Sequence, residues 1–270
     1  MYPRLLRSAP SPYYPSTTRS RALHVRRLNA LGATPYSWND ALMAFSIIAA
    51  GGSGERMGAG GAKFAQPLLG RPMVHYSLEA FQNSPSIEAI VLVVPAACLD
   101  RWSAESLRGS GFSKAAATVA GGGSRQESVR LGLQVIDSKE GTVVVHDAAR
   151  PMVTPAMIES VAVIPEGMDG LIAAVPVTDT IKRVEAGSVS DTIARSGLFS
   201  VQTPQGFTLR ALLQAHQEAA RAGFEATDDS ALIEWRGGRV GVVEGSRENI
   251  KVTYPADMLM AAAVLEGRRK

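Results

Sequence analysis

Strand-like apolar runs alternate along the chain with segments of helical periodicity, from residue 45 onward. The apolar runs of strand length are 45–50, 87–95, 141–147, 170–177 and 237–245. Other segments carry apolar residues at the three- and four-residue spacing of amphipathic helices. These segments are 71–82, 124–136, 154–163, 208–223 and 255–269. The alternation predicts an α/β fold with a mostly parallel sheet and helices on both faces.

Two of the predicted helices carry start signals. Ser124 and Glu127 have the spacing of a capping box, in which side chains accept hydrogen bonds from free backbone N–H groups at the helix start. Thr154 followed by Pro155 fits an N-cap and a first helical residue. In parallel α/β sheets, ligands bind beyond the carboxyl ends of the strands. We therefore expect the chemistry in the loops that follow the strands.

The alternation breaks between about residues 176 and 202. Two β-like halves flank a polar turn at 185–188, a pattern that predicts a long hairpin. A hairpin that protrudes from the sheet as a β-arm cannot bury both of its faces on its own subunit. We expect this arm to pack on a second copy of the chain.

The first 42 residues differ in composition from the rest. They are rich in proline, serine and threonine, and they hold six arginines, no lysine and one acidic residue, Asp40. Such a segment is typical of an organelle transit peptide, and it also fits a start codon placed upstream of Met43. We expect 1–42 to be a disordered tail and 43–270 to be the folded domain. The expected location is the bacterial cytoplasm, or a plastid if the tail is a transit peptide.

Charge and cysteine content exclude several classes of protein. The chain has a net charge of +3, but residues 43–270 hold 22 basic and 24 acidic residues, which argues against a nucleic-acid-binding face. The single cysteine, Cys98, excludes an intramolecular disulfide and a multi-cysteine zinc site. We expect Cys98 to be a small buried residue. No apolar run reaches the length that spans a bilayer.

A glycine-rich loop follows the first predicted strand. Glycines let backbone N–H groups approach a polyphosphate, and Arg56 and Lys63 add positive charge. The spacing is not that of a Walker A loop or a dinucleotide fingerprint, because Met57 stands where the last glycine or alanine is required. The loop residues predicted to hold phosphates are Ala50, Gly51, Gly52 and Gly54.

A second glycine turn opens the helix predicted at 124–136. The backbone N–H groups of Gly122 and Gly123 suit an anion or a base edge, with the hydroxyl of Ser128 nearby. A capped helix start without a ligand is the alternative.

The predicted strand at 141–147 ends in Asp147, and Arg150 follows three residues later. A carboxylate at a buried strand end suits a metal or a substrate hydroxyl, and a structural Asp147–Arg150 ion pair is the alternative. His146 should point away from Asp147, so we expect it to be packed in the fold or to lie at the surface, and not to act as a general base.

A further group of polar residues gives weak signals when its members are taken singly, because each also fits a loop or the surface. It consists of Thr180, Lys182, Arg195, Thr203, the run Thr227-Asp228-Asp229, and the segment 249–253 with Lys251.

Taken in order, these segments resemble the 2-C-methyl-D-erythritol 4-phosphate cytidylyltransferase family of the non-mevalonate isoprenoid pathway. The resemblance runs from about Phe45 to Val264. It rests on AAGGSGERMG with the following lysine, GGGSRQESV, VHDAARP, PVTDTIKR, QTPQGF, ATDDSALIE and VEGSRENIKVT. It implies a Rossmann-like nucleotidyltransferase sheet and the transfer of CMP from CTP to 2-C-methyl-D-erythritol 4-phosphate, with release of pyrophosphate.

The resemblance also implies roles for single residues. The implied catalytic cations are Arg56, Lys63 and Lys251. The implied CTP-binding residues are Ala50, Gly51, Gly52, Gly54, Gly122, Gly123, Ser128 and Asp147. The implied acceptor-binding residues are Arg150, Thr180, Arg195, Thr203 and Thr227. The arm residues among them would act in the neighbouring subunit of a homodimer. The family often has an acidic residue at the position of Gly123, so contacts to the base there are expected from the main chain.

The implied reaction does not require a general base. The attacking phosphate oxygen is anionic near neutral pH, so positioning and positive charge should provide most of the catalysis. We expect a divalent cation, Mg²⁺, on the substrate phosphates, because Mg²⁺ keeps several waters and needs few protein ligands.

Other functions are weighed against this one. A ribitol 5-phosphate cytidylyltransferase has the same nucleotide motifs. A sugar-phosphate or molybdopterin nucleotidyltransferase fits GGGSR and VHDAARP poorly. A non-catalytic nucleotide sensor would not need Arg56, Lys63, Asp147 and Lys251 together, and a dinucleotide dehydrogenase would need a different glycine spacing.

Overall fold

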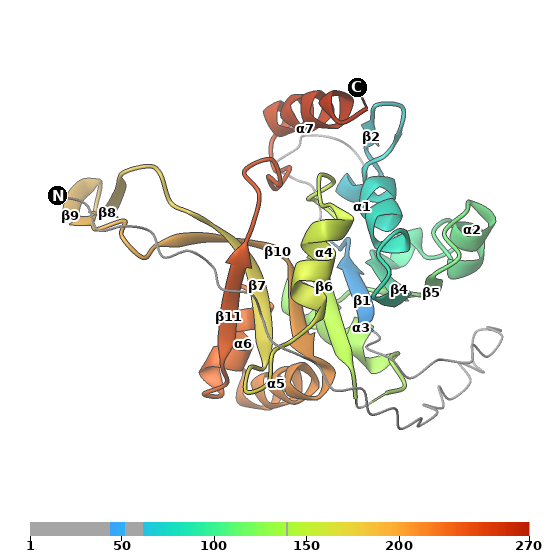
Figure 1. Cartoon of the computed structure of the whole chain (residues 1–270), viewed down its shortest axis with the longest axis horizontal. Helices are drawn as coiled ribbons and strands as arrows, with labels where there is room; N and C mark the ends of the chain where they lie inside the picture. The colour runs from blue at the N-terminus through green and yellow to red at the C-terminus, as the bar shows by residue number, and fades with distance from the viewer. Residues whose placement is uncertain (1–43, 52–61, 139, 270) are drawn as a thin grey trace, which may run out of the picture.

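A twisted sheet forms the centre of the molecule (Figure 1). The structure, a computed structural model, describes residues 44–51, 62–138 and 140–269. Within them, seven strands lie in the order β11-β7-β10-β6-β1-β4-β5. All neighbours pair in parallel except β10, which is antiparallel to both β6 and β7. The predicted mostly parallel α/β sheet is confirmed.

Most of the predicted elements are present, close to their predicted bounds. The strands of the sheet are β1 (Ala44–Ala49), β4 (Ile87–Val94), β5 (Ala115–Ala120), β6 (Thr142–Asp147), β7 (Gly170–Pro176), β10 (Phe199–Thr208) and β11 (Val240–Glu244). The helices are α1 (Met73–Gln82), α2 (Ala104–Gly109), α3 (Arg125–Gln134), α4 (Pro155–Ala162), α5 (Leu209–Ala222), α6 (Asp229–Trp235) and α7 (Pro255–Gly267). The short elements are η2 (Lys63–Ala65), β2 (Pro67–Leu68), β3 (Arg71–Pro72) and η3 (Ala96–Cys98).

Several expectations concern positions outside the described residues. These are the tail at 1–42, a start at Met43, and the loop residues Gly52, Gly54 and Arg56. Cys98 is described, and it is only partly buried at the end of η3, where we expected full burial. No helix in the described ranges is long and apolar enough to cross a membrane.

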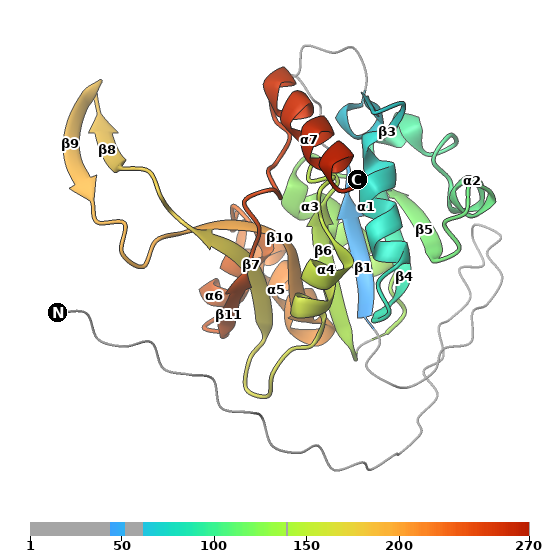
Figure 2. The same cartoon turned by 45° about the horizontal axis from the view of Figure 1, so that its top comes forward.

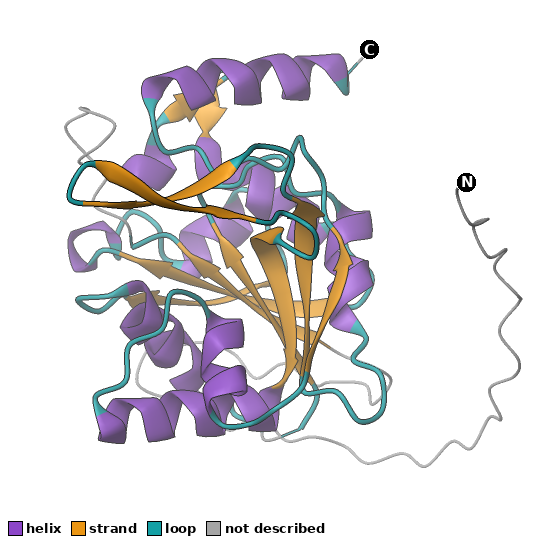
Figure 3. Ribbon diagram, turned by 90° about the vertical axis from the view of Figure 1, so that its left-hand side faces the viewer, coloured by secondary structure: helices purple, strands orange, loops and turns teal. Residues whose placement is uncertain are grey.

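Helices cover both faces of the sheet (Figure 3). Successive strand residues point to opposite faces, so Ile48 packs with α1, α2 and α4, whereas Ile47 packs with α3, α5 and α6. Strands buried on both faces read as continuous apolar runs, which is why the pattern of β1, β4 and β6 identifies them. The Thr154 hydroxyl caps α4 by accepting a hydrogen bond from the Met157 N–H, as predicted.

The sequence pattern does not predict β10 as a strand of the central sheet. Its proline and glycine argue against an inner strand, yet β10 pairs on both sides. An added Cβ at Gly206 would lie 1.8 Å from the carbonyl oxygen of Val161 in α4, so only glycine allows α4 to approach this strand. The pairing with β7 is interrupted between Val201 and Gln205, around a cis peptide bond at Thr203–Pro204.

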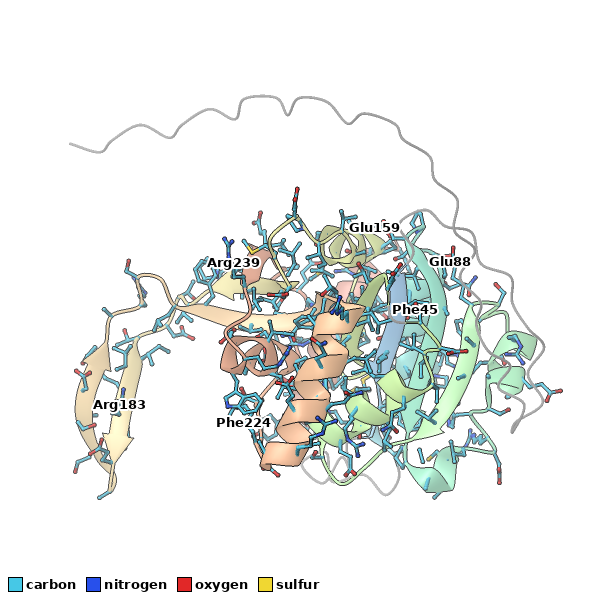
Figure 4. The ribbon with its side chains drawn as sticks, turned by 90° about the horizontal axis from the view of Figure 1, so that it is seen from below. Phe45, Glu88, Glu159, Arg183, Phe224 and Arg239 are labelled. Carbon is cyan, nitrogen blue, oxygen red and sulfur yellow. The ribbon has the colours of Figure 1, made fainter. Side chains whose placement is uncertain are left out.

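The predicted hairpin is confirmed as β8 (Ile181–Glu185) and β9 (Ser188–Ile193), which pair antiparallel. Ala186 and Gly187 between them have φ values of 48° and 80°, as a two-residue hairpin turn requires. The hairpin stands away from the sheet, with Arg183 near its middle (Figures 1 and 4). Because β7 and β10 pair as far as Pro176 and Phe199, the free arm spans 177–198 and is shorter than predicted.

Helix α7 lies beyond the carboxyl end of β1 (Figure 2). Ala261 and Leu265 of α7 pack in one apolar cluster with Met73, Met152 and Val252. This cluster fixes the segment that precedes α7 above the strand ends. It therefore positions Lys251, the neighbour of Val252.

Gly206→Ala should lower the free energy of unfolding by about 3 kcal/mol, because the added methyl group must push β10 and α4 apart. Urea unfolding followed by circular dichroism measures this change. Gly109→Ala is the matched control, because nothing lies within 4 Å of an added Cβ at this end of α2, and it should keep or raise the stability. Equal losses in both variants would contradict the close fit of β10 on α4.

Candidate active site

A cavity of about 690 Å³ lies at the carboxyl edge of the sheet. Its walls come from the end of β1, from η2, from the start of α3, from the end of β6 and from the segment before α7. The predicted site residues that line it are Ala50, Gly51, Lys63, Gly122, Gly123, Ser128, Asp147 and Lys251. Residues from distant parts of the chain thus meet at the edge where the fold class predicts a ligand.

The carboxylate of Asp147, at the end of β6, is held between two cations. Its Oδ1 accepts a hydrogen bond from Arg125 Nε at 2.8 Å, and its Oδ2 accepts one from Lys251 Nζ at 2.7 Å. Burial alone raises the pKa of Asp147, but the charges of Arg125 and Lys251 outweigh burial and hold this pKa well below its usual range. Asp147 is therefore ionised at neutral pH and fixes two cations at the cavity.

Backbone contacts bring Lys251 to this carboxylate. The Val252 N–H donates to the Ala149 carbonyl at 2.8 Å, and the side chain of Asn249 donates to the Thr203 carbonyl at 2.8 Å. The segment before α7 is thereby tied to the residues just after β6 and to the middle of β10. Lys251 lies 104 residues from Asp147 in the sequence, so its ion pair is a product of the tertiary structure.

The glycine turn before α3 is organised by side chains of the helix itself. Ser124 Oγ accepts a hydrogen bond from the Glu127 N–H, as the capping-box pattern predicts. The Glu127 carboxylate accepts from the Gly123 N–H at 2.8 Å, and Ser128 Oγ accepts from the Gly122 N–H at 3.1 Å. The two N–H groups expected to face a ligand are therefore paired within the turn.

Sequence reasoning assigned no role to Arg125, the first residue of α3. Its side chain lines the cavity, and it bridges Asp147 to the buried carboxylate of Asp229, 2.7 Å from Nη1. Burial alone lowers the pKa of Arg125, but the charges of Asp229 and Asp147 raise it above its usual value. A signal was present in the sequence, because a cation in the first turn opposes the helix dipole and requires negative partners from elsewhere.

His146 is fully buried, which decides between the packed and the surface placement that the sequence left open. Its Nε2 lies 3.2 Å from the Arg150 carbonyl oxygen, and its Nδ1 lies 3.1 Å from the Thr203 hydroxyl. Burial lowers the pKa of His146 to about 3, so the ring is neutral near pH 7 and is not a general base.

Thr203 does not line the cavity, in contrast to the direct acceptor contact that we expected. Its side chain is buried, and its hydroxyl accepts a hydrogen bond from the Asp147 N–H at 3.0 Å. With this hydroxyl also bonded to His146, Thr203 supports the end of β6 from behind the cavity.

Arg150 does not pair with Asp147. In the described part of the chain, Asp147 forms ion pairs with Arg125 and Lys251, while Arg150 Nη1 donates to the Asn249 carbonyl at 2.8 Å. Arg150 therefore holds the segment that carries Lys251, and the alternative of an Asp147–Arg150 ion pair is wrong.

The remaining predicted acceptor residues lie away from the cavity of their own subunit. Thr180 and Arg195 are exposed on the arm, where Arg195 donates to the Thr178 carbonyl. Thr227 is exposed just before Asp228, which caps α6. The cavity is thus lined by the predicted nucleotide and catalytic residues that the structure describes, and not by these three.

The donor set at the cavity is sparse for a metal ion. Among the described lining residues only Asp147 is acidic, and no group of three or more His, Cys, Asp or Glu that could hold a metal occurs in the described ranges. A single carboxylate does fit Mg²⁺ when substrate phosphates and water supply the other ligands. Lys251, which is 44% exposed, is the partner of Asp147 that such an ion would displace.

Known proteins resemble this chain over most of its length. Residues 44–267 match the family model of 2-C-methyl-D-erythritol 4-phosphate cytidylyltransferase. Proteins of that name from Bacillus cytotoxicus and Syntrophotalea carbinolica are 43% and 41% identical, covering 83% and 82% of this chain and 98% and 96% of their own. The crystal structure of the Thermus thermophilus protein of that name superposes with a TM-score of 0.65 at 28% identity, covering 82% of this chain and 98% of the other.

The family match covers β1, the glycine turn before α3, the end of β6, the arm and the segment that carries Lys251. These are the elements that build or flank the cavity. The chain belongs to the 2-C-methyl-D-erythritol 4-phosphate cytidylyltransferase family.

Proposed function

We infer that this protein transfers CMP from CTP to 2-C-methyl-D-erythritol 4-phosphate, forming 4-diphosphocytidyl-2-C-methyl-D-erythritol and pyrophosphate. The observation that carries this function is the cavity at the carboxyl edge, where Lys63 and Lys251 flank the ionised Asp147 in a member of this family. The relatives are named for this acceptor, which favours it over ribitol 5-phosphate. A nucleotide sensor would gain nothing from cations that stabilise a leaving group.

The reaction is an in-line displacement at phosphorus. An anionic oxygen of the acceptor phosphate forms a bond to the α-phosphorus of CTP, and the bond from that phosphorus to the bridging oxygen breaks, so pyrophosphate leaves with the electron pair. No proton is removed from the attacking oxygen, which agrees with the neutral, buried His146. The barrier is the meeting of two polyanions, so fixed positive charge is the main requirement.

Three described cations line the cavity, and Lys63 and Lys251 are the two that the family resemblance implies for this role. Lys63 lies in η2, and Lys251 is bonded to Asp147. We assign both lysines to the triphosphate, where they offset the charge that grows on the leaving pyrophosphate. The expected third cation, Arg56, belongs to the same assignment but lies outside the described residues.

The glycine turn before α3 is assigned to the cytosine base. Cytosine presents an amino donor on its edge, and Gly122, Gly123 and Ser124 of the turn line the cavity, where main-chain carbonyl oxygens can accept from it. Ala50 and Gly51, at the end of β1, line the same cavity and are assigned to the nucleotide through their main chain.

Mg²⁺ is proposed as the divalent cation of the reaction. Asp147 is the residue that would hold it, together with the substrate phosphates. When bound, the ion would neutralise phosphate charge. The role of this chain is to keep Asp147 ionised and in place, which Arg125 and the buried Thr203 hydroxyl do.

A homodimer is proposed through the arm. Val184 and Val189 of the hairpin are 57% and 60% exposed, and a two-stranded hairpin without a partner is at best marginally stable in water. Thr180 and Arg195 lie on the same arm, away from their own cavity. In a symmetric pair, each arm would bring these two residues to the acceptor in the other subunit.

Lys251→Ala should lower kcat for pyrophosphate release by about a hundredfold or more, since it removes a preorganised charge from the transition state. Arg239→Ala is the matched control, because it removes one positive charge beside the amino end of β11, at the opposite edge of the sheet. Coupled detection of pyrophosphate measures both rates. Turnover of Lys251→Ala near that of the control would sink the assignment.

Arg195→Ala should raise the KM for the acceptor and leave the KM for CTP unchanged, because the arm is assigned to the acceptor alone. Mixing this variant with Lys251→Ala tests whether the arm acts across subunits. A mixed dimer contains one site with both Lys251 and a partner arm that carries Arg195, so activity should recover on mixing. Recovery that is absent although mixed dimers form would exclude an arm shared between subunits.

A further inference from the structure

A chain of buried charged groups runs from the cavity into the protein behind it. Arg125 Nη1 donates to Asp229 Oδ2 at 2.7 Å, and Asp229 Oδ1 lies 3.0 Å from Nε2 of His216 in α5. The side chains of Asp229 and His216 are each 1% exposed. Neither residue lines the cavity, so neither can touch the substrates from its present position.

The segments joined by this chain are also held together without it. Gln126 donates to the Phe224 carbonyl at 3.0 Å and accepts from the Ala226 N–H at 2.9 Å, which ties α3 to the connection between α5 and α6. Phe224 in this connection, labelled in Figure 4, stacks on Trp235 with ring centroids 4.7 Å apart. A buried ion pair adds little stability once its desolvation is counted, so packing alone does not account for Asp229.

The charges of the ion-paired groups behind the cavity balance only when Asp229 is included. Arg125 and Lys251 carry two positive charges, and Asp147 and Asp229 carry two negative ones. The Arg125 side chain is 26% exposed and that of Lys251 is 44% exposed. If Asp147 were the sole counter-ion, the more buried Arg125 would compete most strongly for it. Asp229 removes this competition by giving Arg125 a carboxylate of its own.

We propose that Asp229 is a positioning residue of the transfer reaction. It holds Arg125 in place, so Oδ1 of Asp147 keeps a fixed partner. Oδ2 can then release Lys251 when the substrates bind. His216 secures the far side of Asp229 through Nε2–H. Its Nδ1 is buried without a hydrogen-bond partner among the described residues, so the contact with Asp229 is its one polar anchor there. This inference rests on the proposed function.

The test is a set of variants in the assay with CTP and 2-C-methyl-D-erythritol 4-phosphate. Asp229→Asn keeps the shape of the side chain and removes its charge, and it should lower kcat about tenfold or more, with the acceptor KM little changed. Arg125→Gln should act in the same direction. The double variant should be no slower than Arg125→Gln alone, because Asp229 acts through Arg125.

Asp228→Asn is the matched control for this set. It makes the same chemical change one residue earlier, where the side chain caps α6 by accepting from the Ala231 N–H, and asparagine is an equally good cap. Its kcat should stay within about twofold of the wild type, because the substitution preserves the helix cap and creates no cavity or unpaired buried charge.

Two results would overturn the proposal. One is a kcat of Asp229→Asn equal to that of the control. The other is a double variant whose losses multiply, because Asp229 would then act independently of Arg125.

If circular dichroism shows that Asp229→Asn does not fold, His216→Gln and His216→Leu take its place. Glutamine keeps an N–H donor and should preserve kcat, whereas leucine should lower it, and equal rates would count against the proposal. An inactive wild type would instead contradict the proposed function.

Discussion

The shared carboxylate of Asp147 is the interaction on which the rest of the site depends. Two cations from different parts of the chain meet on its two oxygens. A buried carboxylate is costly unless it is paired and hydrogen-bonded, and here the pairing is what collects positive charge at the cavity. The same contacts that keep Asp147 ionised therefore hold Arg125 and Lys251 at the wall of the cavity that we assign to the triphosphate.

The sheet topology explains why these groups can meet. Parallel strands β1 and β6 end at the same edge, so the loops that leave them open side by side. The antiparallel β10 brings Thr203 behind β6, and the segment before α7 crosses back to bond Ala149. Asp147 is thus contacted by three parts of the chain, through Arg125, Lys251 and Thr203.

The arm has the opposite character. Its strands pair only with each other, and their apolar side chains face water. A rigid carboxyl edge holds the nucleotide and phosphate residues, and the exposed hairpin holds the residues assigned to the acceptor. Dividing the site in this way would couple acceptor binding to assembly, because a subunit alone keeps its arm apart from its own cavity.

The local features of this protein follow from short stretches of its sequence. These features depend on residues that are only a few positions apart, so a short stretch of sequence is enough to predict them. They include the period of two in strands, the helical spacing, the Thr154 cap and the turn at 185–188. Apolar runs identified β1, β4 and β6 because both of their faces are buried. The glycine turns and Asp147 could be placed at the carboxyl edge because the alternation of elements fixes where strands end.

The pairings between distant residues and strands, in contrast, depend on the packed fold. Helices α2 and α6 are too short to show a period, and the proline and glycine of β10 concealed a strand that is stabilised by its contact with α4. The sequence analysis singled out Lys251 but not Arg125. The carboxylate of Asp147 lies 104 and 22 residues from these two cations, and Asp229 lies 104 residues from Arg125. Electrostatic partners at such separations are chosen by which strand ends and helix starts the packed sheet brings together, and no local pattern encodes that choice.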